Sequence, residues 1–96
     1  MDYVVAIPSY NRADLCNDKT LKMLNDNNIL PTNIVVFVAN EDEHKEYEKK
    51  LNKTLYSELI IGEKGLVRQR QFISNYFSSD KNIVCLDDDI ESVDLS

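Results

Sequence analysis

Three consecutive aspartates, Asp87, Asp88 and Asp89, directly follow an apolar segment and are the clearest chemical signal in the sequence. Carboxylates this close together repel one another, so a compensating cation is expected beside them. Mg²⁺ and Mn²⁺ bind proteins through one or two carboxylates together with substrate phosphates. The triplet therefore predicts a divalent-metal site, although an acidic turn after a strand explains the triplet alone equally well.

A second polar group, Pro8, Ser9, Tyr10, Asn11 and Arg12, follows the first apolar segment. Proline fixes its own φ, and the next four residues offer a hydroxyl, an aromatic ring, a carboxamide and a guanidinium. Tyr10 could stack on a base, and Arg12 could bind a phosphate through two hydrogen bonds. Taken alone, however, the segment is more typical of an ordinary turn whose Ser and Asn satisfy the main chain.

A third group of polar residues lies within 65–71, at the start of a helix that we predict over residues 66–77. On a helical wheel Arg70 lies within the apolar stripe, and Arg68 points the opposite way. The stripe consists of Leu66, Ile73 and Phe77. A core-facing arginine is costly unless it is paired, so we expect Arg70 to pair with an aspartate of the triplet or with a phosphate. Gly65, just before the helix, would let a phosphate or ribose approach the main chain.

Four short apolar segments, at 3–7, 34–39, 59–61 and 83–86, are rich in β-branched residues and do not alternate with polar ones. This pattern is typical of parallel strands that are covered on both faces. Helical segments are expected between them: one capped by Asn17 or Asp18, one over 42–52 and one over 66–77.

This alternation of strands and helices predicts an α/β fold. We expect a Rossmann-like three-layer α/β/α domain, with a four-stranded parallel sheet in the order 3-2-1-4. Ligands bind such sheets at the carboxyl ends of the strands, where the strand order reverses. The segments 8–12 and 87–89 should meet there, with Glu41 and Asp42 beside them.

The composition fits one globular domain over residues 1–96. The chain has a formal net charge of −6 and 43% apolar residues. An acidic balance argues against a general nucleic-acid coat, which needs clustered Lys and Arg. The two cysteines, Cys16 and Cys85, are too few for a disulfide scaffold and are expected to be reduced. With no signal peptide and no membrane segment in view, we expect a soluble cytoplasmic protein, in the host cytoplasm if it is viral.

In their order along the chain, these motifs resemble the nucleotide-sugar glycosyltransferases of the GT-A fold. The family they resemble most is the TET-associated glycosyltransferases, thought to act on modified bases in phage and related DNA. The matching motifs are Pro8-Ser9-Tyr10, Thr20-Leu21, Gly65-Leu66, Gln69-Arg70, Phe72-Ile73 and the aspartate triplet as the DxD motif.

The resemblance implies a metal-dependent glycosyltransferase that uses Mn²⁺ or Mg²⁺ and a nucleotide-sugar, with a UDP-sugar as the first candidate. Its acceptor is open, and modified DNA bases are the candidate that the family suggests. The metal ligands would be Asp89 and Asp87. The nucleotide-sugar-binding residues would be Pro8, Ser9, Tyr10, Asn11, Arg12, Glu41, Asp42, Gly65, Arg70, Asp87 and Asp88.

The resemblance covers only the donor-binding half of a GT-A enzyme, because the sequence stops at Ser96, just past the triplet. The catalytic base is therefore expected outside this chain, and a partner chain or a homo-oligomer could supply it. One alternative is a non-catalytic nucleotide-binding or assembly module that needs a partner chain. Another is a phosphoryl-transfer enzyme, but that class usually has an acidic residue at the end of the first strand, where Ile7-Pro8-Ser9 stands here.

Overall fold

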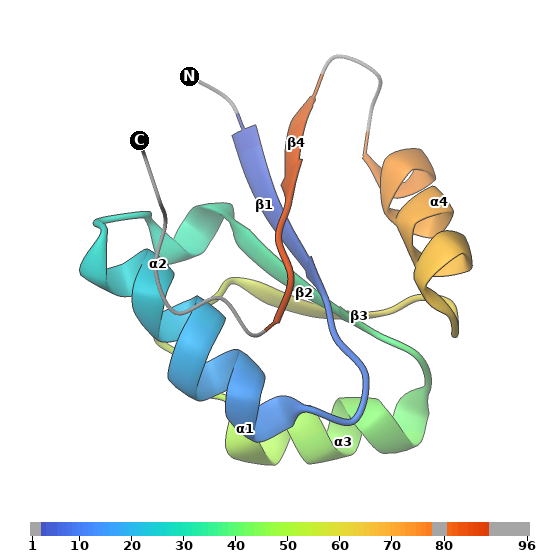
Figure 1. Cartoon of the computed structure of the whole chain (residues 1–96), viewed down its shortest axis with the longest axis horizontal. Coiled ribbons are helices and arrows are strands. Elements are labelled where there is room, and N and C mark those ends of the chain that lie inside the picture. The colour runs from blue at the N-terminus through green and yellow to red at the C-terminus, as the bar shows by residue number, and fades with distance from the viewer. Residues whose placement is uncertain (1–2, 78–80, 89–96) are drawn as a thin grey trace.

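The computed structural model describes residues 3–77 and 81–88. Its sheet has four parallel strands in the order β3-β2-β1-β4 (Figure 1). The strands are β1 (Tyr3–Pro8), β2 (Ile34–Val38), β3 (Glu58–Ile61) and β4 (Asn82–Cys85). The predicted α/β class, the parallel sheet and the strand order are thereby confirmed.

The helices connect the strands as expected, but the first of them begins earlier than predicted. It consists of α1 (Ala13–Leu15), a π-helical stretch η1 (Cys16–Leu21) and α2 (Lys22–Asp26). The prediction that Asn17 or Asp18 caps this helix is wrong, because Ala13 and Cys16 already pack against the sheet and start the helix without a capping side chain.

The later helices lie close to their predicted bounds. A short 3₁₀ turn, η2 (Pro31–Asn33), precedes β2, α3 spans Glu41–Lys50, and α4 spans Leu66–Tyr76. Asn40 caps α3 by accepting a hydrogen bond from the main-chain N–H of Glu43. The acidic residues of the first turn of α3 and the lysines of its last turn complement the helix dipole.

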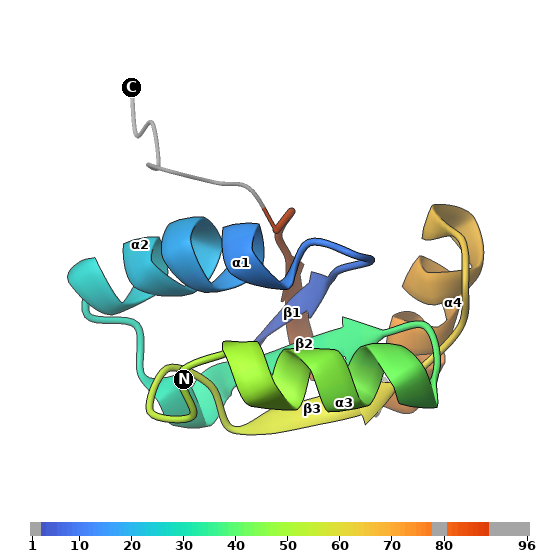
Figure 2. The ribbon, with the colours of Figure 1, turned by 90° about the horizontal axis from the view of Figure 1, so that it is seen from below.

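The sheet is covered unequally on its two faces. The segment α1–α2 and helix α3 cover one face, and α4 covers the other (Figure 2). The larger core contains Val5, Ile7, Ala13, Cys16, Leu21, Met23, Leu24, Ile34, Val36, Val38, Tyr47 and Leu51. The smaller core beneath α4 contains Val4, Ala6, Val35, Phe37 and Ile73. All of β2 is buried, whereas β4 at the sheet edge is largely exposed.

Within 3–77 and 81–88, no helix is both long enough and apolar enough to cross a membrane. Both cysteines are free thiols, with Cys16 buried in the larger core and Cys85 exposed on β4.

Candidate functional site

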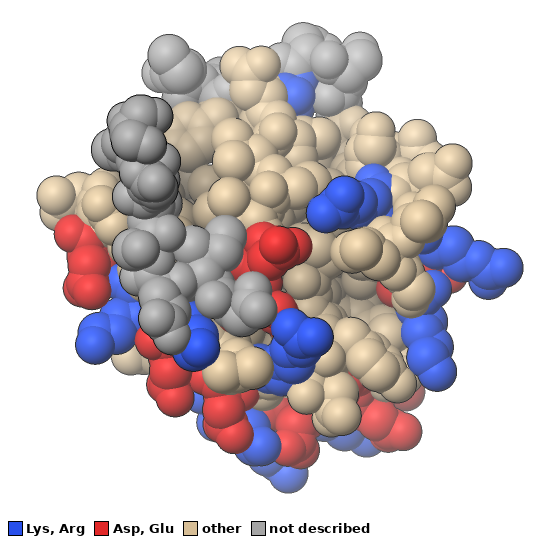
Figure 3. All heavy atoms as spheres, in the orientation of Figure 1, with Lys and Arg blue, Asp and Glu red and all other residues tan. Residues whose placement is uncertain are grey.

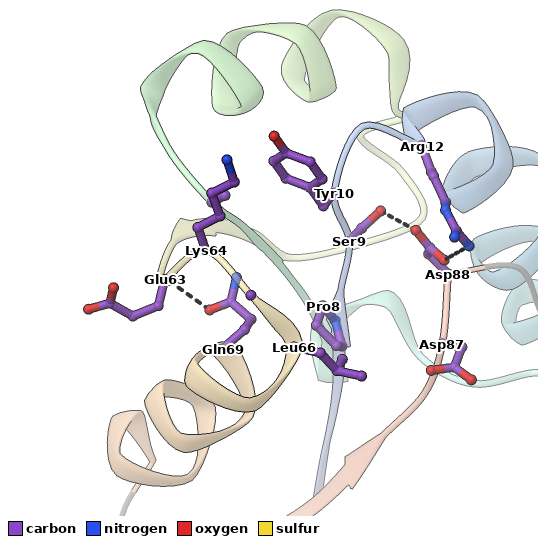
Figure 4. Close-up of a pocket in the computed structure, with 12 residues that line it drawn as sticks. Pro8, Ser9, Tyr10, Arg12, Glu63, Lys64, Leu66, Gln69, Asp87 and Asp88 are labelled. Carbon is purple, nitrogen blue, oxygen red and sulfur yellow. Dashed lines mark hydrogen bonds and ion pairs between the residues drawn. The ribbon is translucent and has the colours of Figure 1, made fainter.

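A cavity of about 540 Å³ opens at the carboxyl ends of the central strands (Figure 4). Its volume falls within the range of small-molecule sites. The lining residues are Pro8, Ser9, Tyr10, Arg12, Ala39, Glu63, Lys64, Gly65, Leu66, Gln69, Asp87 and Asp88. The segments that follow β1 and β4 therefore meet at one site, at the edge where a doubly wound sheet binds its ligands.

Behind one wall of the cavity, a chain of hydrogen bonds joins α3 to the segments that follow β1 and β4. The Ser9 hydroxyl donates to Asp88 Oδ2 at 2.6 Å and lies 2.6 Å from the Tyr47 hydroxyl oxygen. That oxygen also accepts from the main-chain N–H of Arg12 at 3.0 Å. Since each hydroxyl has one hydrogen to donate, Tyr47 donates to Ser9 and Ser9 donates to Asp88. Burial raises the pKa of Tyr47 to about 12, so its hydroxyl stays protonated at neutral pH.

Asp88 is fixed from both of its oxygens. Ser9 binds Oδ2, and the Arg12 guanidinium lies 3.4 Å from Oδ1. The side chain of Asp88 is 8% exposed, whereas that of Arg12 is 53% exposed. Arg12 thus compensates a carboxylate that lies mostly inside the protein, and its own charge still reaches the solvent at the cavity.

The Asp87 side chain is exposed, whereas that of Asp88 is buried, and Asp87 is held through its main chain. Its main-chain oxygen accepts a hydrogen bond of 2.6 Å from the buried Thr20 hydroxyl, which ties the end of β4 to η1. Its side chain is exposed and lines the cavity. Adjacent residues of an extended segment point to opposite sides, so burying Asp88 turns the Asp87 carboxylate outward.

The opposite wall is organised by Gln69 on α4. This side chain is 4% exposed, accepts from the Glu63 main-chain N–H at 2.9 Å and donates to the Val38 carbonyl at 3.2 Å. It therefore joins α4 to β2 and to the loop after β3. A Cβ atom at Gly62 would collide with the Gln69 amide, so the close approach requires glycine there.

The loop before α4 places a cation and an aromatic ring at the mouth of the cavity. Lys64 Nζ lies 5.5 Å from the centre of the Tyr10 ring, a cation–π distance, and Tyr10 is 50% exposed. Gly65 follows with φ of 97° and brings the first turn of α4 to the cavity. The face of the Tyr10 ring can accept either Lys64 or a flat group of a ligand.

The structure brings most of the predicted binding residues together. Pro8, Ser9, Tyr10, Arg12, Gly65, Asp87 and Asp88 all line the cavity. Asn11, Glu41, Asp42 and Arg70 are not among its lining residues. Asn11 takes a left-handed φ of 55°, and its main-chain N–H donates to Glu43. Glu41 and Asp42 lie exposed in the first turn of α3. Asp89 lies outside the described residues.

The predicted orientation of Arg70 is wrong. The buried residues of α4 are Gln69 and Ile73, with Phe72 packed beside them, and Leu66 is 58% exposed. Arg70 is exposed, as is Arg68, and the arginine that pairs with the buried aspartate is Arg12. The helical wheel places Leu66 in the core, but Leu66 lies at the mouth of the cavity. The predicted buried face of α4 is therefore rotated away from the true one.

Sequence reasoning missed several residues that build the site. Gln69, Phe72, Ile73 and Tyr76 follow the spacing i, i+3, i+4, i+7 and mark the true inner face of α4. This spacing is visible in the sequence, but Gln69 is polar, so the set does not read as an apolar stripe. Tyr47 is a buried residue of α3, and no local pattern in the sequence shows that its hydroxyl reaches Ser9, 38 residues away.

The described carboxylates fit a metal only in part. Both Asp88 oxygens already have partners, while the exposed Asp87 carboxylate is accessible from the cavity. In the part of the chain that the structure describes, no three His, Cys, Asp or Glu side chains are grouped closely enough to form a metal site by themselves. Mg²⁺ requires only one or two carboxylates when substrate phosphates complete its coordination, and Asp87 meets that requirement.

Comparisons with models of protein families, with curated proteins and with solved structures found no match to this chain.

Proposed function

We propose that the cavity binds a nucleotide-sugar, with UDP-sugars as the first candidates, and that the chain is the donor-binding half of a metal-dependent glycosyltransferase. The proposal rests on the meeting of two polar segments at the carboxyl edge of a parallel sheet. One segment carries Tyr10 and Arg12, and the other carries Asp87 and Asp88.

The two ends of the cavity suit different parts of such a ligand. The half-exposed Tyr10 ring offers a stacking surface for a base. The Asp87 carboxylate offers a hard oxygen ligand for a cation that is shared with a diphosphate. A bound Mg²⁺ or Mn²⁺ would neutralise the leaving diphosphate, and Asp87, with Asp89 beyond the described residues, would hold it. Arg12 would face the same diphosphate while keeping Asp88 in place.

Calorimetric titration of UDP and UDP-sugars, each with Mn²⁺ and with EDTA, tests the proposal. Affinity for UDP should fall about tenfold or more when the metal is removed. Asp87→Asn should abolish most of that metal dependence. Asp42→Asn, which removes the same charge from an exposed site outside the cavity, should keep it. Metal-independent binding of UDP, or equal effects of the two variants, would show that Asp87 holds no cation.

A second candidate function is a nucleotide-binding module without catalysis. Two observations favour it. Both oxygens of Asp88 are held by Ser9 and Arg12. His44 lies on α3 outside the cavity lining, so its imidazole offers no general base to a ligand there. The two functions differ in turnover. Metal-dependent release of UDP from a UDP-sugar, or sugar transfer to DNA with modified bases, supports the enzyme, and tight binding without either supports the module.

A further inference from the structure

Strand β4 lies at the edge of the sheet and leaves an apolar surface uncovered. Among the described strands it pairs only with β1, whereas β1 lies between two neighbours. Val84 is 43% exposed on one face, and Cys85 is exposed on the other. Figure 3 shows uncharged surface over this part of the molecule, with acidic side chains just below it and a basic side chain to its right (Figure 3). An exposed edge of this kind is a template for pairing with another strand.

The hydrogen-bond pattern identifies which residues face outward along this edge. Ala6 is the partner of Cys85 in the β1–β4 ladder, and the Ala6 carbonyl accepts from the Leu86 N–H at 3.0 Å. In a parallel ladder the residues on either side of Cys85 therefore direct their main-chain groups toward β1. The main-chain groups of Ile83 and Cys85 point the other way, toward the open edge.

The segment 81–87 is complementary to itself when it runs antiparallel. It reads Lys-Asn-Ile-Val-Cys-Leu-Asp, with an apolar middle between a cation and an anion. We propose that β4 pairs with β4 of a second copy of this chain about a two-fold axis at Val84. This pairing joins the two four-stranded sheets into one continuous sheet.

Two independent features select this register. It places Ile83 opposite Cys85 of the second copy, and both residues carry the outward main-chain groups that a hydrogen-bonded antiparallel pair requires. It also places Lys81 opposite Asp87 of the second copy, a favourable cross-strand pair. Shifting the register by two residues keeps the hydrogen bonds, but it moves Lys81 opposite Cys85 in one direction and Asp87 opposite Ile83 in the other, so the Lys81–Asp87 pair is lost either way.

The proposed interface is small and adjoins the cavity. Pairing of two short strands buries less than a standard interface, so a weak, concentration-dependent dimer is expected. The Lys81–Asp87 pairs lie at the exposed ends of the interface, so added salt should weaken the dimer. Asp87 also lines the cavity, which places Lys81 of the second copy at the cavity mouth. The proposal holds whatever ligand the cavity binds.

Sedimentation velocity of the full chain over a wide concentration range tests the pairing. The wild-type chain should shift from monomer to dimer as its concentration rises, and Val84→Lys should raise the dimer Kd about tenfold or more. Ile61→Lys is the matched control, because Ile61 is 41% exposed on the other edge strand, β3. A monomer at every concentration, or a dimer that Val84→Lys leaves intact, overturns the proposal.

A charge exchange tests the register. Lys81→Asp should weaken the dimer, and the double variant Lys81→Asp/Asp87→Lys should restore the wild-type Kd to within about threefold. Failure of this rescue in a folded double variant overturns the register. If the double variant does not fold, Val84→Cys in a Cys85→Ser background replaces it. Val84 lies on the two-fold axis in a closely spaced, non-hydrogen-bonded pair, so mild oxidation should link two copies through residue 84. Absence of that link overturns the register as well.

Discussion

Asp87 and Asp88 are neighbours in sequence, but Asp88 holds the site together and Asp87 is accessible to a ligand. Asp88 is buried, receives Ser9 and Arg12, and thereby fixes the loop after β1. Asp87 remains exposed and accessible to a ligand. Like-charge repulsion within the triplet predicts a divalent cation beside it, and in the described chain the charge that lies beside Asp88 is the Arg12 guanidinium. On the proposed function, a divalent metal would be held by the exposed Asp87, by Asp89 beyond the described residues and by the phosphates of a ligand.

Tyr47→Phe should destabilise the protein, because it removes the hydroxyl that connects α3 to the loop after β1. The main-chain N–H of Arg12 and the oxygen of Ser9 would each lose a buried partner. We expect the free energy of unfolding to fall by about 1–3 kcal/mol in urea denaturation. Tyr56→Phe, at a half-buried ring in the same core, should change it by less than about 0.5 kcal/mol. Equal losses in the two variants would contradict the proposed role of the Tyr47 hydroxyl.

The buried thiol of Cys16 should make stability fall in alkaline solution. Burial, and secondarily the charge of Asp88, raises the pKa of Cys16 from 9.0 to about 12. The unfolded chain therefore releases this proton at lower pH than the folded chain does. The contribution of Cys16 is fully present below pH 9.0 and is lost progressively from there toward pH 12.

The measurement that checks this is the free energy of unfolding between pH 8 and pH 10, a range that brackets the ordinary pKa of the thiol. Cys16→Ala should flatten the decline with pH. Cys85→Ala should retain most of it, because Cys85 is exposed and burial raises its pKa less. An unchanged slope in Cys16→Ala would show that other groups cause the loss.

At the scale of elements, the strands could be predicted within about one residue, whereas the face that α4 turns toward the sheet could not. Each strand is a short run of β-branched residues that ends at a polar segment, and this local pattern determines where it lies in the chain. The faces of α4 depend on where its first turn lies relative to the sheet. Leu66 at the cavity mouth and Gln69 in the interior reverse the usual preference of apolar and polar residues. Tertiary contacts, which the sequence does not show, produced that reversal.

The start of the first helix shows the same limit. No capping side chain marks Arg12, yet the helix begins at Ala13 because burial of Ala13 and Cys16 stabilises its first turns. For the site, the strand pattern was enough to bring loops 8–12 and 87–88 together. It could not reveal the bond between Tyr47 and Ser9 or the place of Gln69, because both depend on residues far apart in sequence.

Gly62 and Gly65 should both resist substitution, for different physical reasons. A Cβ at Gly62 would collide with the Gln69 amide, whereas a Cβ at Gly65 would meet no atom within 4 Å. Gly65 instead has φ of 97° and ψ of 137°, a conformation that residues with a Cβ rarely adopt. Gly65→Ala should therefore cost about 1–3 kcal/mol through backbone strain alone.

A double-mutant cycle with Gln69→Ala separates the two causes. Shortening Gln69 removes the atom that the new Cβ at Gly62 would meet, so Gly62→Ala should cost clearly less in that background. Gly65→Ala should cost the same in both backgrounds, because the new Cβ at Gly65 would not contact the Gln69 side chain. Coupling between Gly65 and Gln69 larger than about 0.5 kcal/mol would contradict this explanation.

At the scale of the molecule, the sheet divides the domain into a large core and a small one. The face under α1–α2 and α3 carries a continuous cluster of buried side chains, whereas α4 contributes Ile73 as its one residue of the smaller buried cluster. The cavity lies between these unequal halves, since Ser9 and Asp88 belong to the loops on the well-packed side and Gln69 belongs to α4. A ligand that touches both walls would therefore bind a rigid element and a more weakly held one.

Native-state hydrogen exchange should reveal this difference. Amides of β1 and β2 should be the most protected, because both strands are buried within the sheet, and amides of α4 should exchange through local opening at lower free energy. UDP with Mn²⁺ should raise the protection of the first turn of α4 more than that of α3, because Gly65 and Leu66 line the cavity and α3 contributes no lining residue. Ile73→Ala should lower protection in α4 first and leave the amides of α2 close to wild type, since α2 packs on the opposite face. Equal protection of α2 and α4 in the free protein, or an equal loss in both on Ile73→Ala, would mean that the domain opens only as one cooperative unit and that the two walls of the cavity are equally rigid.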